Sequence, residues 1–415
     1  MESIDQIGAR AREASGQLAQ LDTETKNRIL EKVAESMVKN ASVILEENRK
    51  DLAQAREMGL KGAIVDRLML SEQRIESMAA GLRQLVQLED PVGEVEGMKR
   101  RPNGLLIGKR RVPLGVVGVI YESRPNVTAD VGGLCLKTGN VCVLRGGKEA
   151  IHSNQVIVSL FREILQSMAI HPDCIQLIGD TSRESARAMM KMDRYLDILV
   201  PRGGAGLIRT VVENSTVPVI ETGVGNCHVY VDESADPEMA ARIVVNSKTH
   251  RPGVCNAAES LLIHRDIAEK AVPFIGKALL DAGVEIRGDK TVCSLLDQAK
   301  SATEEDWGAE YLDLVISAKT VDSLEDAISH IHTYGSGHSE AIVTTRYTNA
   351  QTFLDRVDAA AVYVNASTRF TDGQEFGYGA EIGISTQKLH ARGPMGLREL
   401  TTTKYIIYGD GQVRE

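Results

Sequence analysis

Several features that would assign the chain to a membrane, secretory or metal-binding class are missing. No run of about 18 consecutive apolar residues occurs, so no membrane-spanning helix is expected. The N-terminal stretch MESIDQIGARAREASGQ has neither an apolar h-region nor a cleavage site. The six cysteines lie far apart, without a Cys-X-X-Cys pair or a Cys/His ligand spacing, which argues against zinc and against a disulfide framework. We therefore expect a cytoplasmic protein with reduced thiols and no metal.

The chain has fewer basic than acidic residues, 48 Lys and Arg against 57 Asp and Glu. The 415 residues carry a formal net charge of −9, which argues against a nucleic-acid partner and against binding to anionic membranes. An anionic small-molecule substrate is compatible with this charge, because a few cations can line a pocket. With 43% hydrophobic and 25% charged residues, the chain has the composition of a globular protein of two or three domains.

The pattern of apolar residues changes along the chain. Residues 1–90 have helical periodicity, with Asp22 as an expected N-cap. From residue 113 to 235, β-branched apolar runs alternate with helical segments, and a second region of this kind follows. Such alternation predicts βαβ units on parallel sheets. The basic segment 96–112 and the alternating tail after residue 398 are instead expected to be extended.

Two glycine-rich turns follow expected strands of the first region. They are Arg145-Gly146-Gly147-Lys148 and Pro201-Arg202-Gly203-Gly204-Ala205-Gly206. Turns of this kind before a helix suit the phosphates of a cofactor. The GxGxxG fingerprint is absent, however, and ordinary βα loops have the same composition.

One cysteine stands in a reactive setting. Cys255 follows the Pro252-Gly253 turn, with His250 and Arg251 just before it. Nearby cations lower the pKa of a thiol from about 8.5, and a helix starting after the turn would add its positive dipole. These features favour a nucleophile. The alternative is a small apolar residue on a buried turn, which is the usual fate of a free cysteine.

Three motifs in order along the chain resemble the aldehyde dehydrogenase superfamily and, within it, the γ-glutamyl phosphate reductase family. They are YESRPNVT at 121–128, KTHRPGVCNA at 248–257 and GAEIGISTQKLHARGPMGL at 379–397. The resemblance runs nearly end to end. It implies an α/β fold, aldehyde dehydrogenase-like, with two parallel-sheet domains and a small β oligomerisation arm.

The resemblance also implies a domain map. Residues 1–95 and 113–235 would form the NADP-binding domain, and 236–365 the catalytic cysteine domain. Residues 366–397 would be a glycine-rich active-site segment that returns to the cofactor domain. The arm would combine 96–112 with 398–415, and it would make the protein a homo-oligomer, either a dimer or a tetramer.

The implied reaction is the NADPH-dependent reduction of L-γ-glutamyl 5-phosphate to L-glutamate 5-semialdehyde and phosphate, in proline biosynthesis. Functional coupling to glutamate 5-kinase, which makes the unstable substrate, is an associated expectation. One alternative is another superfamily member with a different acyl donor or aldehyde. A second is a non-catalytic binding protein on the same fold, which the cysteine and its motif disfavour.

By family position, Cys255 would attack the acyl phosphate and hold a thioester, and Asn126 would donate to the developing oxyanion. Glu221 matches the general base of hydrolytic relatives. A base that activates water would waste the thioester, so Glu221 is expected to tune the thiol or shape the nicotinamide pocket.

Further roles follow from the same resemblance. The expected cofactor-binding residues are Arg145, Lys148, Arg202, Gly203, Gly204 and Glu310. The expected substrate-binding candidates are Arg124, His250, Arg251 and Arg369. For each of these four cations, a structural salt bridge is the alternative reading, but an anionic substrate requires at least one of them. Two cations at the end of one strand favour NADPH over NADH.

Overall fold

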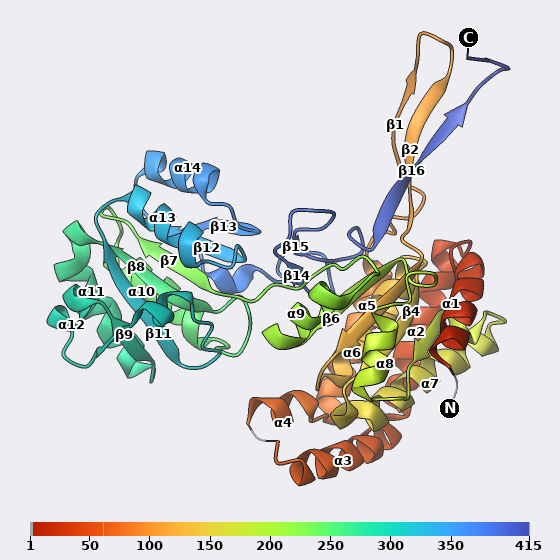
Figure 1. Cartoon of the computed structure of the whole chain (residues 1–415), viewed down its shortest axis with the longest axis horizontal. Helices are drawn as coiled ribbons and strands as arrows, with labels where there is room; N and C mark the ends of the chain where they lie inside the picture. The colour runs from red at the N-terminus through yellow and green to blue at the C-terminus, as the bar shows by residue number, and fades with distance from the viewer. Residues whose placement is uncertain (1–2, 61, 415) are drawn as a thin grey trace. The chain divides into compact units, whose positions relative to one another are not determined.

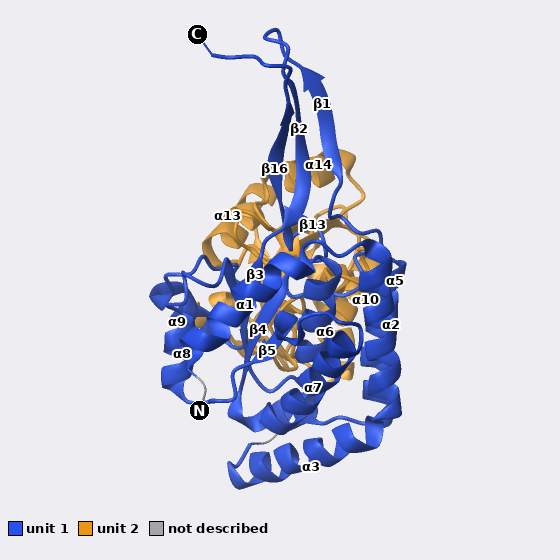
Figure 2. Cartoon of the chain, turned by 90° about the vertical axis from the view of Figure 1, so that its right-hand side faces the viewer, with its two compact units in different colours: residues 1–222, 377–383, 395–415 blue, residues 223–376, 384–394 orange. Residues whose placement is uncertain are grey.

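The computed structural model describes residues 3–60 and 62–414, so the ends of the expected ranges at 1, 2 and 415, and residue 61, lie outside it. The chain divides into two compact units. The first comprises 1–222, 377–383 and 395–415, and the second comprises 223–376 and 384–394 (Figure 2). Among the described helices, none combines the length and apolar content that a bilayer crossing requires.

The first unit contains a four-stranded parallel sheet with the order β5-β4-β3-β6 (Figure 1). All six residues of β3, with the sequence VVGVIY, are buried. A continuous apolar run of this kind suits a parallel strand that is covered on both faces. The strands are β3 (Val116–Tyr121), β4 (Val141–Gly146), β5 (Ile175–Leu177) and β6 (Ile198–Arg202).

Helices precede and connect these strands. The N-cap expected at Asp22 is confirmed, because its carboxylate accepts the Thr25 N–H at 2.7 Å. The apolar stripe of that helix, Ile29, Val33 and Met37, is fully buried. The helices are α1 (Ile4–Leu18), α2 (Thr23–Lys39), α3 (Ala41–Glu57), α4 (Ala63–Leu68), α5 (Glu72–Gln87), α6 (Pro125–Lys137), α7 (Ile151–Ser167), α8 (Arg183–Met189) and α9 (Ala205–Asn214).

An antiparallel arm extends from the body of this unit (Figure 1). It consists of β1 (Val95–Arg100), β2 (Leu106–Pro113) and β16 (Thr401–Tyr408), in that order. The hairpin and the tail strand expected from the sequence are both confirmed, and β16 pairs with β2 along its full length.

The second unit is built on a seven-stranded parallel sheet with the order β10-β9-β11-β8-β7-β12-β13. Its strands are β7 (Cys227–Val231), β8 (Ala258–His264), β9 (Glu285–Gly288), β10 (Lys300–Ser301), β11 (Val315–Val321), β12 (Ser339–Val343) and β13 (Ala361–Val364). Its helices are α10 (Pro237–Thr249), α11 (Arg265–Asp281), α12 (Lys290–Leu295), α13 (Leu324–Tyr334) and α14 (Tyr347–Arg356). A two-stranded ladder joins β14 (Ile384–Ser385) and β15 (Gly393–Pro394).

The strand β7 belongs to this second sheet, because it pairs with β8 and β12. Residues up to 235 were expected to belong with the first sheet, whereas the second compact unit begins at Gly223. Apolar periodicity identifies a strand but does not specify its neighbours, so this assignment required the pairing itself.

Candidate active site

Cys255 lies in a turn between the end of α10 and the start of β8. The expected helix after the Pro-Gly turn is therefore wrong, since Ala258 already begins a fully buried strand. Any activation of the thiol must come from neighbouring groups rather than from a helix dipole.

Hydrogen bonds from a distant segment hold this turn. The Asn256 side chain donates to the Thr371 carbonyl at 2.9 Å, and the Thr368 hydroxyl donates to the Asn256 carbonyl at 2.7 Å. Arg369 also donates to the Asn256 side-chain oxygen. These bonds fix the backbone on one side of the cysteine.

Gly225 approaches the same turn from the segment before β7. A Cβ on Gly225 would lie only 1.6 Å from the Cys255 carbonyl oxygen, so no other residue fits without displacing backbone. The Gly225 N–H donates to Glu310 Oε1 at 2.8 Å. Glu310, one of the expected cofactor-binding residues, therefore orders the backbone beside Cys255 in this structure.

A histidine that the sequence analysis did not single out contacts the thiol. His338 Nε2 lies 3.1 Å from Cys255 Sγ, and its ring is fully buried. Its Nδ1 lies 2.8 Å from the Ser339 hydroxyl. The segment Gly335-Ser336-Gly337-His338 ends a glycine-rich turn just before a buried strand, and that position was the available signal.

A second thiol lies beside this pair. Cys227 Sγ donates to the Cys255 carbonyl oxygen at 3.2 Å and lies 3.8 Å from His338 Nδ1. Burial raises the pKa of Cys227 well above its usual value. Cys227 therefore stays protonated and acts as a hydrogen-bond donor to the turn.

Cationic side chains accompany the thiol in this unit. His250 and Arg251 are exposed, and within the described residues neither forms an ion pair, so the salt-bridge alternative has no support for these two. Burial lowers the pKa of Arg369, and the nearby Arg251 adds to this, while Asp372 and the Cys255 thiol oppose it. The Nε of Arg369 is buried without a partner among the described residues.

A buried ion pair supports the motif from behind. Lys248 Nζ and Glu259 Oε2 are 2.5 Å apart, and both side chains are fully buried. Burial raises the pKa of Glu259 to about 7 and lowers that of Lys248, so each partner needs the other to keep its charge. Glu259 Oε1 also accepts the Leu312 N–H at 3.3 Å, which anchors the segment that carries Glu310.

The remaining candidates belong to the first unit. The Asn126 side chain is exposed in the first turn of α6 and donates to Asp130 at 3.0 Å. Burial raises the pKa of Asp130 to about 6. Arg124 is the N-cap residue of the same helix, and Glu221 is half-buried in an irregular segment.

The strand ends of the first sheet carry the cofactor candidates. Arg145, at the end of β4, donates to the Thr181 and Ser182 carbonyls at 2.7 Å each. Lys148 is exposed and has no partner within the described part of the chain. The Nε atoms of Arg145 and Arg202 are buried and unpartnered among the described residues. Orphaned donors at the ends of two parallel strands suit an anionic cofactor.

The turn before α9 already contains a carboxylate. Glu122 accepts the Gly204 N–H at 3.0 Å, and a Cβ on Gly203 would lie 2.5 Å from the same carboxylate. Gly203 and Gly204 therefore accommodate a protein carboxylate at the helix N-terminus, where the sequence analysis expected the pyrophosphate.

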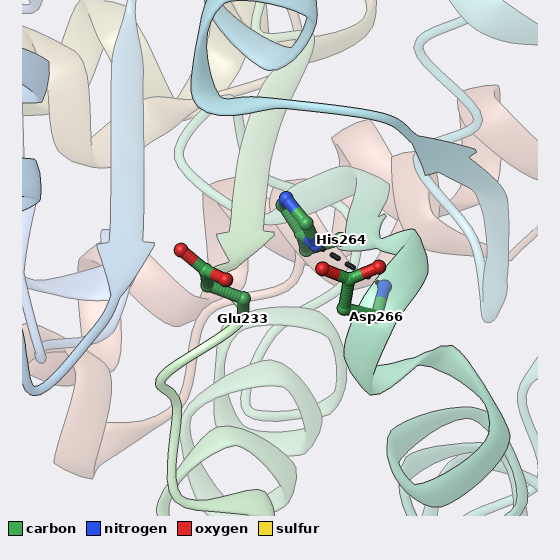
Figure 3. Close-up of side chains that lie close together, drawn as sticks. All are labelled: Glu233, His264 and Asp266. Carbon is green, nitrogen blue, oxygen red and sulfur yellow. Dashed lines mark hydrogen bonds between the residues drawn. The ribbon is translucent and has the colours of Figure 1, made fainter.

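One cluster of potential metal ligands occurs in the described structure. Glu233, His264 and Asp266 bring potential ligand atoms within 4.8 Å of one another (Figure 3). His264 Nδ1 accepts the Asp266 N–H at 3.2 Å as the N-cap of α11, and Glu233 pairs with Arg346. A helix cap and an ion pair account for the cluster, so it carries no argument for a metal.

The sheet order, the cysteine turn and the arm together define a class of protein. The sequence pattern of the aldehyde dehydrogenase family matches residues 1–310. The chain therefore belongs to the aldehyde dehydrogenase family, and the expected fold class is confirmed. This family consists of enzymes that act with nicotinamide cofactors on small molecules.

Proteins that are similar over the whole chain identify the branch of that family. γ-Glutamyl phosphate reductases from Carboxydothermus hydrogenoformans and Lachnospira eligens are 61% identical over 414 residues and 59% identical over 415, covering 100% of each chain. The crystal structure of γ-glutamyl phosphate reductase from Thermotoga maritima has a TM-score of 0.97 at 49% identity, again covering 100% of both chains.

Proposed function

We propose that this enzyme reduces L-γ-glutamyl 5-phosphate to L-glutamate 5-semialdehyde and phosphate, with NADPH as the reductant. The observation that carries this proposal is the full-length similarity to γ-glutamyl phosphate reductases, together with a cysteine held in a hydrogen-bonded turn beside a histidine. In its pathway, this reaction is a step of proline biosynthesis.

Cys255 performs the acyl transfer. Its sulfur attacks the acyl carbon, a C–S bond forms, and the C–O bond to phosphate breaks to leave a thioester. When bound, the nicotinamide cofactor supplies the hydride that reduces this thioester. The resulting hemithioacetal collapses to the aldehyde and frees the sulfur. The Cys255 N–H donates to the oxyanion that develops at both stages, and the same role for Asn126 rests on its position in the family motif alone.

Cofactor binding falls to the strand ends of the first unit. Lys148 is the better placed partner for a 2′-phosphate, because Arg145 already donates to two carbonyls. Arg202 is a further candidate, because its Nε is buried and has no hydrogen-bond partner among the described residues. Gly204 can bind the pyrophosphate only after Glu122 releases its N–H.

Substrate anions are bound by cations from loops. The exposed His250 and Arg251 and the buried Nε of Arg369 are the preferred ligands, since none of these groups has an ion-pair partner among the described residues. Arg124 is the fourth candidate. Glu221 tunes the thiol or shapes the nicotinamide pocket rather than activating water.

The protein acts in the cytoplasm as a homo-oligomer whose arm pairs between copies. Tyr405, Ile407 and Tyr408 on β16 are 57–66% exposed, which suits burial against another subunit. Functional coupling to glutamate 5-kinase is retained as a proposal, because an acyl phosphate hydrolyses readily in water.

The reverse reaction tests the proposed function. Glutamate semialdehyde, phosphate and NADP⁺ are mixed with the enzyme, and formation of NADPH is followed. We expect turnover that requires phosphate and that arsenate can also support, because the thioester must be cleaved by an oxyanion rather than by water. NADPH formation at the same rate without phosphate would instead identify a hydrolytic aldehyde dehydrogenase. A panel of other aldehydes separates this enzyme from relatives with different acyl donors.

A further inference from the structure

A buried imidazole contacts the sulfur of the proposed nucleophile. His338 Nε2 lies 3.1 Å from Cys255 Sγ, within hydrogen-bonding distance for sulfur. Both residues belong to the second unit, and the turn on one side and the start of β12 on the other fix them.

A chain of hydroxyl groups sets the orientation of the imidazole. Ser339 Oγ lies 2.8 Å from His338 Nδ1 and 2.6 Å from Thr371 Oγ1, which in turn lies 2.7 Å from the Tyr363 hydroxyl. Burial raises the pKa of Tyr363 to about 12, so the chain ends in a neutral phenol. Each hydroxyl can accept one hydrogen bond and donate another, so Nδ1–H can donate to Ser339 while Nε2 presents its lone pair to the thiol.

We propose that His338 is the acid–base partner of Cys255. This proposal deepens the function proposed above and rests on it for the identity of the substrate. As the C–S bond forms, the thiol proton moves from Sγ to Nε2, and it leaves with the departing phosphate as hydrogen phosphate. When the hemithioacetal collapses, one proton from solvent returns through His338 to the sulfur. The cycle thus consumes the one proton that reduction of an acyl phosphate requires.

Several other charged and titratable groups near the pair are less suited to this role. Arg369 and Arg251 interact electrostatically near the thiol, but guanidinium groups stay protonated. Cys227 faces Nδ1 from β7, and burial raises its pKa well above the usual value. Glu340, next to Ser339 in sequence, is bound to the backbone and ring of His228.

Glu259 also interacts electrostatically with Cys227, but it is engaged with Lys248. His338 lies at hydrogen-bonding distance from Sγ, and histidine is a side chain that can exchange a proton near neutral pH.

Alkylation of the thiol tests the proposal without substrate or cofactor. Cys255 is alkylated with iodoacetamide across a range of pH, in a background in which the half-exposed Cys293 is replaced by serine. The variant is His338→Gln, which keeps a hydrogen-bonding group but cannot take a proton. The matched control is His332→Gln on the exposed face of α13.

We expect His338→Gln to slow alkylation at neutral pH at least tenfold and to move the rise in rate to higher pH, while His332→Gln matches the wild type. Turnover by His338→Gln should fall by about 10²–10⁴-fold with KM nearly unchanged, as for loss of a general acid–base group. His338→Asn provides a second test if the glutamine variant does not fold, as judged by thermal melting.

Wild-type alkylation rates across the whole pH range in folded His338→Gln or His338→Asn would overturn the proposal. The reverse assay separates this failure from failure of the proposed function. If the thiol alkylates as expected but the enzyme does not reduce NADP⁺ with glutamate semialdehyde, the proposed role of His338 stands and the proposed substrate is wrong.

Discussion

The contact between Gly225 and the cysteine turn allows one substitution to be worked out in detail. A methyl group at Gly225 would meet three backbone atoms of Cys255, the carbonyl oxygen at 1.6 Å, the carbonyl carbon at 2.3 Å and Cα at 2.6 Å. Backbone atoms cannot rotate away as a side chain can. An ordinary contact begins near 3.4 Å, so the turn must move by nearly 2 Å.

We therefore expect Gly225→Ala to lose at least 100-fold in turnover, since a displacement of about 1 Å at a reacting group can cost about 10²-fold. The overpacking itself should cost about 1–3 kcal/mol of stability. Turnover is measured in the reverse direction, stability by thermal melting, and the position of the thiol by its alkylation rate. All three should change together.

Gly308→Ala is the matched control. Gly308 lies in the same unit, is exposed, and has nothing within 4 Å of a Cβ placed on it. This variant should melt and turn over as the wild type does. A folded Gly225→Ala enzyme with turnover within twofold of the wild type would refute the close-approach argument, because the added methyl would then have found room.

Three further predictions address the nucleophile, the cofactor and the pH dependence of stability. Cys255→Ala should abolish turnover while leaving cofactor binding and thermal melting intact, and appreciable activity in that variant would contradict the thioester mechanism. Lys148→Ala should raise the KM for NADPH at least tenfold and leave the KM for NADH nearly unchanged, because one charge-assisted hydrogen bond contributes about 1.5–3 kcal/mol. Arg145→Ala should instead lower thermal stability, because the Arg145 guanidinium donates hydrogen bonds to two backbone carbonyls. Burial lowers the pKa of His330 to about 3, and neighbouring charges contribute less. In the unfolded chain this histidine binds a proton below about pH 6.5, whereas in the folded state it stays neutral there. Stability should therefore fall from pH 7 to pH 5 by about 2 kcal/mol more in the wild type than in His330→Phe, and equal slopes in denaturant titrations would contradict the assignment.

Local signals in the sequence predicted many of the helices and strands and pointed to one candidate nucleophile. Apolar β-branched runs such as residues 115–121 predicted buried strands, because a strand covered on both faces needs no polar alternation, and β3 occupies 116–121. Asp22 predicted its helix start because a capping carboxylate acts within three residues. Cys255 was singled out as a candidate nucleophile from residues directly beside it, and the resemblance of the surrounding motif to a family then favoured that role.

These local signals could not predict which distant residues the fold brings together. His338 lies 83 positions from Cys255, and periodicity does not specify which strand ends meet. Gly225 could not be distinguished from other glycines in the sequence, because composition does not show where two backbone segments approach closely. The roles of Asn126 and Glu221 stay predictions, and the helix expected after Cys255 was wrong because the apolar run that follows is a strand.

The thiol contacts and the candidate cofactor residues belong to different units, which predicts different effects for substitutions in each. The contacts to the turn of Cys255 from His338, Gly225, Thr371 and Cys227 all lie within the second unit. The candidate cofactor residues at the strand ends belong to the first unit. A substitution at Lys148 should therefore reduce hydride transfer while thiol alkylation proceeds normally, whereas substitutions at His338 or Gly225 should impair both. Loss of alkylation after a change at Lys148 alone would mean that the thiol depends on the first unit as well, and the separation of roles argued from these contacts would not hold.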